Sequence, residues 1–327
     1  MSGAAAHTRF GQAQIVMLIA FVAFVAFSAL TPNFLSPSNV TQLIENVSIL
    51  GILAIGMAIS ILGRGIDLSM VASMAVSVAW MLASMNAGRP LWESLGLAVL
   101  FSLAVGLING VLIAYVEIPP IFATLAMGTA IYGFGRVFLL ASDVNNLPAA
   151  WNWLNEIATA KLLGIPVAVI CFAVVCLIGH LFLRHTREGR FVYMMGDNPL
   201  AARITGAPVR PMIVAQYLLT SMVALAAGLL MAALIASMNT RIAGSNLVYD
   251  VILVVVLGGV GLSGGRGGVV SVIVGTLLIG ILVNGMTMLN LSYITQNVIK
   301  ALILLVALIM DSLVNPRDEQ TSQQGDI

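Results

Sequence analysis

The sequence predicts an all-α integral membrane protein with about ten transmembrane helices, and three observations lead to this fold class. Lys, Arg, Asp and Glu make up 8% of the 327 residues, against about 25% in an ordinary soluble domain. Hydrophobic residues make up 60%, and the mean hydropathy is +1.06. Long apolar runs follow one another along almost the whole chain, so no room remains for a soluble domain. We therefore expect a single transmembrane domain over residues 1–327.

Each helix is predicted from the length of its apolar run, because a bilayer core about 30 Å thick needs roughly 20 apolar residues. The first run follows His7 and Arg9, but it is long for a cleaved signal, so we interpret it as an uncleaved first helix. The run near 248–262 is short, and that at 211–238 is long enough to tilt or break. The candidate spans are 14–31, 46–63, 68–86, 91–115, 121–141, 165–183, 211–238, 248–262, 268–290 and 296–314.

The positive charges predict the orientation. With a cytoplasmic N-terminus, nine cationic residues face the cytoplasm and three face the other side, which obeys the positive-inside rule. Both termini are then cytoplasmic, and the loop at 141–164, with Trp151 and Trp153, is periplasmic: an interfacial anchor or a docking surface. Arg136 and Lys300 fall within spans, near ends where they can reach the interface. The cytoplasmic set is Arg9, Arg64, Arg184, Arg187, Arg190, Arg203, Arg210, Arg266 and Arg317; the opposite set is Arg89, Lys161 and Arg241.

Several classes of function are disfavoured by what the chain lacks. A net charge of +1 gives no field to attract nucleic acid. Cys171 and Cys176 lie five residues apart, on different helix faces, so neither a disulfide nor a metal site is expected. The sequence contains no acid–base pair that would indicate an enzyme. No carboxylate lies in the middle of a span, which argues against an ion-coupled carrier.

The segment 184–210 is the largest interruption of the apolar pattern and carries five arginines. Asp197 and Asn198 can cap a helix, and Pro199 suits its first position, which predicts a short helix over 200–205. A plain connector needs no such helix. The segment is either a basic cytoplasmic loop or a protein-docking element that transmits force.

Two further interruptions share a pattern. Gly65-Ile-Asp-Leu-Ser69 and Gly259-Val-Gly-Leu-Ser263 have Gly, Leu and Ser at the same spacing, which favours a duplicated core. The first is a capped turn or a polar hinge beside a transport path. The second lies in a glycine-rich run, 258–268, that imitates a dinucleotide fingerprint and an ATPase signature. It lacks the βαβ setting and the P-loop lysine that nucleotide binding needs, so we interpret it as close helix packing.

Three stretches carry a resemblance that covers nearly the whole chain: 65–69, 189–206 and 258–268 running into Asp311. Together they resemble the membrane permease subunits of ribose-type ABC sugar importers, the ribose, xylose and autoinducer-2 group. That family usually continues the first stretch with Val-Gly-Ser, where this chain has Met70-Val71-Ala72-Ser73. The family's Gly-x-Asn and following alanines are matched by Gly196, Asn198, Ala201 and Ala202.

The resemblance implies the fold of the vitamin-B12 (type II) importers, about ten helices with an internal repeat, in a bacterial inner membrane. It implies a second permease subunit, identical or paralogous, and a periplasmic sugar-binding protein. It also implies a separate ATPase with two nucleotide-binding cassettes, which would bind ATP and Mg²⁺, so this chain would hold no cofactor and catalyse nothing. The cytoplasmic helix would then be a coupling helix in a groove of that ATPase, formed by Gly196, Asp197, Asn198, Ala201, Ala202, Arg203 and Gly206.

The path of the solute is predicted less specifically. Polar side chains in or beside spans can offer groups to a sugar, or can simply bond neighbouring helices. The candidates are Asp67, Asn109, Tyr132 and Asn284. Branched-chain amino acids or nucleosides remain alternative solutes, and a stand-alone secondary carrier remains the alternative class.

Overall fold

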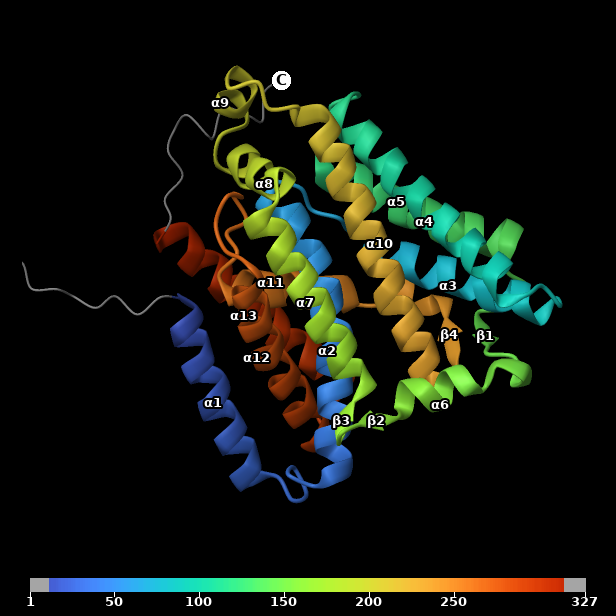
Figure 1. Ribbon diagram of the computed structural model, residues 1–327. Helices are drawn as coiled ribbons and strands as arrows, with labels where there is room; N and C mark the ends of the chain where they lie inside the picture. Colours follow the sequence, from blue (N-terminus) through green and yellow to red (C-terminus); the bar gives the residue numbers. More distant parts are fainter. Residues whose placement is uncertain (1–11, 315–327) are drawn as a thin grey trace, which may run out of the picture.

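The computed structural model describes residues 12–314, and helices dominate this part of the chain (Figure 1). The longer helices form one bundle around α2. Short elements connect them. The helices are α1 (Gln12–Leu30), α2 (Pro37–Leu62), α3 (Met70–Asn86), α4 (Leu91–Ala114), α5 (Pro120–Phe134), α6 (Trp153–Thr159), α7 (Val167–His185), α8 (Arg187–Asp197), α9 (Pro199–Ile204), α10 (Val209–Ile235), α11 (Leu247–Gly258), α12 (Val269–Met288) and α13 (Tyr293–Val314).

The predicted helical membrane fold is confirmed, because every predicted apolar run contains a helix. Seven helices in the described part are long and apolar enough to cross a bilayer: α1, α2, α4, α5 with its continuation to Leu139, α7, α10 and α12. Three shorter apolar helices, Met70–Asn86, Leu247–Gly258 and Tyr293–Ile309, fill the remaining predicted runs. The short run before Gly258 is indeed a helix of only 12 residues, whereas the long run at 211–238 folds as one unbroken helix of 27 residues, α10.

The centre of the bundle is α2, which is buried along most of its length. A helix that is apolar on all sides is expected in the interior, and α2 packs against α7, α10, α11 and α12. The most extensive packing between two helices joins α10 to α4. Gly106 and Gly110 make that contact close, because any side chain there would meet the α10 backbone at Tyr217 and Val214.

The connections differ at the two ends of the bundle (Figure 1). The helices α8 and α9 lie at one end, and α6 with the β2–β3 hairpin lies at the opposite end. Two short antiparallel pairs also occur within connections: β1 (Val144–Asn146) with β4 (Ser237–Asn239), and β2 (Lys161–Leu162) with β3 (Ile165–Pro166). The predicted separation of the loop 141–164 from the basic segment 184–210 agrees with this arrangement.

Lys300 departs from its prediction. Its side chain is only 9% exposed, and its Nζ lies 2.7 Å from Oδ1 of Asp250, so it forms an inner ion pair rather than reaching the interface. Arg136 lies in a short π-helix, Gly135–Leu139, and pairs with Asp143 at 2.9 Å. Arg9 and Arg317 lie outside the described residues.

Candidate functional site

The basic segment folds as two capped helices in series. Thr186 caps α8 through its hydroxyl, which accepts from the Gly189 amide at 3.0 Å. Asn198 caps α9 in the same way, its Oδ1 accepting from the Ala201 amide at 3.0 Å, and Pro199 takes the first helical position. The predicted short helix is confirmed. Asn198 is the cap, and Asp197 is the last residue of α8.

The outer face of α9 is apolar although it lies beyond the end of the bundle. Ile204 is 87% exposed and Leu200 is 60% exposed. Arg203 and Ala201 are exposed beside them. Large exposed apolar side chains occur on surfaces that meet another protein or a membrane. Sequence reasoning missed Leu200 and Ile204, although their four-residue spacing places them on one face of the short helix.

Ala202 does not share that face. It is 1% exposed and belongs to the main apolar core. The sequence assigned Ala201 and Ala202 to the same contact because both are small. Small size allows close approach to a partner or to the chain's own core; Ala202 packs in the core, whereas Ala201 is exposed.

Arg64 connects the segment 184–210 to both of the other interruptions. Its Nε donates to the carbonyl oxygens of Gly196 at 2.8 Å and of Ser263 at 2.9 Å. Its Nη2 donates to the carbonyl oxygen of Asp197 at 2.9 Å. Burial lowers the pKa of Arg64, and the Asp197 carboxylate counteracts that shift. Three interruptions far apart in the sequence therefore meet at one guanidinium.

Glycines make the same junction tight. A Cβ on Gly196 would collide with the Leu62 carbonyl oxygen and the Gly265 amide nitrogen, both backbone atoms. The Gly265 amide donates to the Leu62 carbonyl at 2.9 Å, so the ends of the two interruptions are bonded directly. Tyr193 adds a further link, because its hydroxyl donates to the Gly267 carbonyl at 2.9 Å. Burial raises the pKa of this phenol, so it stays a donor. We call the residues 62–65, 193–197 and 263–267 the junction.

Two of the four predicted path residues come together. Asp67 is fully buried, and its Oδ1 accepts from the Ser69 amide at 3.0 Å and from the Ser69 hydroxyl at 2.6 Å. The same hydroxyl accepts from Asn109 Nδ2 at 2.8 Å. The second carboxylate oxygen of Asp67 and the amide oxygen of Asn109 are buried without a hydrogen-bond partner. The turn is therefore more than a cap: it places an unsatisfied polar group between α3 and α4.

The other two predicted path residues lie elsewhere. Asn284 forms a reciprocal amide pair with Asn39, at 3.1 and 2.9 Å, which joins α12 to the start of α2. Its hydrogen-bonding groups are thus used between helices, the alternative that the sequence left open. Tyr132 is half-buried on α5.

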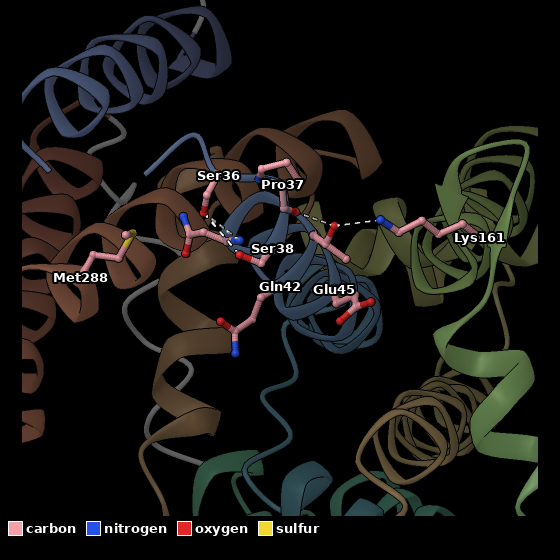
Figure 2. A pocket seen from close by; sticks show the side chains of 9 residues that line it. Ser36, Pro37, Ser38, Gln42, Glu45, Lys161 and Met288 are labelled. Atoms are coloured by element: carbon pink, nitrogen blue, oxygen red, sulfur yellow. Dashed lines mark hydrogen bonds between the residues drawn. The ribbon is translucent and has the colours of Figure 1, made fainter. Parts of the chain in front are cut away.

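A polar hollow (Figure 2) lies beside the start of α2 and β2, at the end of the bundle opposite α9 in Figure 1. Its volume is about 710 Å³, and its walls come from the start of α2, the β2 strand and the end of α12. Lys161 donates to the hydroxyl of Thr41 at 3.2 Å across the rim. Glu45 and Gln42 add a carboxylate and an amide. The hollow is open and hydrophilic, which suits contact with a soluble molecule.

The described residues contain no group of three or more His, Cys, Asp or Glu side chains that can hold a metal ion. Within the same part of the chain, Cys171 and Cys176 are free thiols.

The fold defines an all-helical, multi-pass membrane protein, and comparison with known proteins gives its family. Residues 39–308 match the family model described as branched-chain amino acid transport system / permease component. The chain belongs to this family of ABC transporter permeases.

Among similar proteins, the ribose import permease protein RbsC of Bacillus subtilis (strain 168) is 34% identical, over 87% of this chain and 88% of its own. The ribose import permease protein RbsC of Escherichia coli (strain K12) is 31% identical, over 87% and 89%. The galactose/methyl galactoside import permease protein MglC of Haemophilus influenzae is 30% identical, over 86% and 88%. No solved structure matches the chain significantly.

Proposed function

We propose that this chain is the membrane permease subunit of an ABC importer that translocates a small sugar, most simply a monosaccharide. The relatives named for ribose and for galactose, similar over most of their length, support this solute class. In this proposal a periplasmic binding protein delivers the sugar. A separate ATPase with two nucleotide-binding cassettes binds ATP and Mg²⁺ and supplies the energy.

The observation that carries the proposal is the exposed apolar face of α9. Leu200 and Ile204 project from a short helix that Asn198 caps, and the residues before it, Gly196 and Asp197, are bonded to Arg64. Burial of both side chains in a groove of an ATPase would remove them from water, worth roughly 1.5–3 kcal/mol each. The coupling set is then Leu200, Ala201, Arg203 and Ile204 on the outside, with Gly196, Asp197 and Asn198 anchoring it and Gly206 closing it.

The junction gives a route for coupling. Movement of α9 pulls on Gly196 and Asp197, whose carbonyls Arg64 holds. Arg64 also holds Ser263, so the same movement reaches the end of α2 and the start of α12. The ends of these helices border the buried Asp67 turn and the glycine-rich turn. A displacement of the ATPase is thereby transmitted to two helix breaks at once.

The topology belongs to the same proposal. The end with α8 and α9 is cytoplasmic, the loop 141–164 and the polar hollow at Lys161 are periplasmic, and both termini are cytoplasmic. The three short apolar helices complete ten spans in a bacterial inner membrane, in the style of the vitamin-B12 importers, with a second permease subunit beside them.

The proposal is tested by disrupting the α9 face and asking whether the ATPase still binds. The double variant Leu200→Glu with Ile204→Glu should lose the co-purifying two-cassette ATPase and ATP-dependent uptake, while the chain still inserts in the membrane. Leu163→Glu is the matched control, because Leu163 is 95% exposed in the β2–β3 connection at the other end. Normal ATPase binding and uptake by the α9 double variant would refute the proposal.

Two alternative functions remain, and measurements of uptake distinguish them from the proposal. The family description favours branched-chain amino acids as a second candidate solute class, which competition of uptake by leucine against ribose would decide. A stand-alone carrier would transport without any ATPase.

A further inference from the structure

A second cavity, with a mostly apolar wall and several polar groups, opens at the surface of the bundle between α11 and α13. Its volume is about 440 Å³, within the range of small-molecule sites. Aliphatic side chains of Leu253, Val298 and Leu304 form part of its wall. The polar part is made by Asn246, Tyr249, Asp250, Tyr293, Asn297 and Lys300.

The Asp250–Lys300 ion pair lies at the wall of this cavity. Lys300 Nζ is 2.7 Å from Asp250 Oδ1 and 2.8 Å from Oδ2, and the two side chains are 9% and 18% exposed. Both residues belong to apolar helices. Charged side chains in such helices are costly in a bilayer, so they face the bundle interior or a water-filled space and mark solute pathways.

The side-chain amide of Asn297, close to Lys300 on the same helix, lacks one hydrogen-bond partner. The Oδ1 atom of Asn297 is buried and has no hydrogen-bond partner. Asn297 lies on α13, three residues before Lys300, and therefore on the same face of the helix. An unsatisfied acceptor of this kind costs free energy unless a bound group or water donates to it. A hydroxyl group is the simplest donor that fits beside a carboxylate and an ammonium.

The cavity is not closed by this chain. Tyr249 is 52% exposed, Tyr293 is 59% exposed and Ile294 is 75% exposed around it. Hydrocarbon cannot hydrogen-bond the exposed phenols or the amides behind them. These groups therefore need water, another protein or the polar interface of the bilayer beside them, and the second permease subunit proposed above would cover this face.

We propose that the cavity between α11 and α13 is a contact site for a polyhydroxylated solute, an aldose or a similar polyol, on the path between the two permease subunits. The inference rests on the proposed function, because it assumes that a second subunit closes over this face. Carboxylate, amide and ammonium groups bond the hydroxyls from three sides, and the two tyrosine rings pack against the C–H face. Neither Asn297 nor Lys300 stood among the path residues expected from the sequence.

Thiol accessibility in the assembled transporter tests the site without relying on transport. In a chain with Cys171→Ser and Cys176→Ser, Asn297→Cys should react with a membrane-impermeant methanethiosulfonate reagent applied from the periplasmic side. Leu177→Cys, on the apolar exposed face of α7, should not react, and Leu162→Cys in the β2–β3 hairpin should react fully. D-Ribose or D-galactose should slow the labelling of Asn297→Cys severalfold, and leucine should not.

The outcomes separate this site from the permease proposal. An unreactive Asn297→Cys with a reactive Leu162→Cys overturns the site, because the cavity then faces lipid. Labelling that no sugar slows overturns the solute contact. Asn297→Leu should lower sugar uptake severalfold while the ATPase still co-purifies, with Thr295→Val on the same helix as an unchanged control. Absence of an ATPase from the unsubstituted complex would instead overturn the permease proposal, and labelling with sugar protection would still support the site.

Discussion

The two interruptions at 63–69 and 258–268 hold the same segment, 184–210, by different means. The first uses a side chain, because Arg64 reaches two carbonyls at the α8–α9 corner and one in the second interruption. The second uses bare backbone: Gly264 and Gly265 have φ of +84° and +71° and pack directly against Gly196 and Asp197. Of the shared Gly, Leu and Ser positions, only Ser263 takes part in these bonds, and it does so through its backbone carbonyl.

The difference shows where each turn is specified. Arg64 has φ of +65°, a left-handed conformation that costs a non-glycine residue roughly 1–2 kcal/mol. Glycine would occupy that position without strain. The hydrogen bonds of the Arg64 guanidinium must therefore stabilise the fold by more than the strained backbone costs. The glycine-rich turn has the opposite logic, since any side chain would separate the two elements. One turn is fixed by hydrogen bonds and the other by absence of side chains.

The largest effect is expected where the backbone contact is closest. Gly196→Ala places a methyl group against the Leu62 carbonyl and the Gly265 amide, and neither can rotate away. Overpacking of this kind costs about 1–3 kcal/mol. We expect ATP-dependent uptake to be lost and thermal unfolding in detergent to occur at lower temperature. Gly133→Ala on α5 is the control, because nothing lies within 4 Å of its added Cβ. Normal uptake by Gly196→Ala would show that the contact is not needed.

A smaller but more specific effect is expected at Arg64. Lysine is a point charge and cannot serve the same carbonyls as a planar fork, so Arg64→Lys should lower uptake about tenfold, equivalent to ~1.4 kcal/mol. Arg64→Gly removes the same bonds but also relieves the strain. We expect it to match Arg64→Lys in uptake and to be the more heat-stable of the two. Uptake that follows stability rather than the hydrogen bonds would contradict a coupling role.

The helices were predictable because each depends on a local pattern. Apolar runs of sufficient length gave the spans, and Asn198 followed by Pro199 gave the start of α9, since a cap and a first-turn proline act within a few residues. The junction was not predictable, because Arg64 bonds Gly196 at a separation of 132 residues and Ser263 at 199. The residues next to Arg64 in the sequence do not indicate which distant residues it contacts.

The same reason explains why the contacts of single residues could not be predicted. Lys300 was expected to extend toward the interface. Its partner Asp250 lies 50 residues away, so the sequence does not indicate that the two side chains pair. Asn284 was expected in the path, but Asn39, 245 residues away, satisfies its amide. Ala202 was expected at a partner's surface because its small side chain fits there. The same small side chain also fits in the core of this chain, where it lies. In each case the residue type was informative and its direction was not.

The smallest effect is expected at Tyr193, which binds α8 to the second interruption through a single side-chain bond. Tyr193→Phe removes the hydrogen bond to Gly267 and should cost about 0.5–1.5 kcal/mol of unfolding free energy with a modest loss of uptake. Combining it with Arg64→Lys tests whether the two interruptions act as one unit. We expect the combined loss in uptake to differ from the sum of the single losses, because the Gly265–Leu62 bond joins the two turns directly. Additivity within about 0.3–0.5 kcal/mol would mean that each turn holds α8 and α9 independently. The segment 184–210 would then be anchored at two separate points, and movement of α9 would reach α2 without reaching α12.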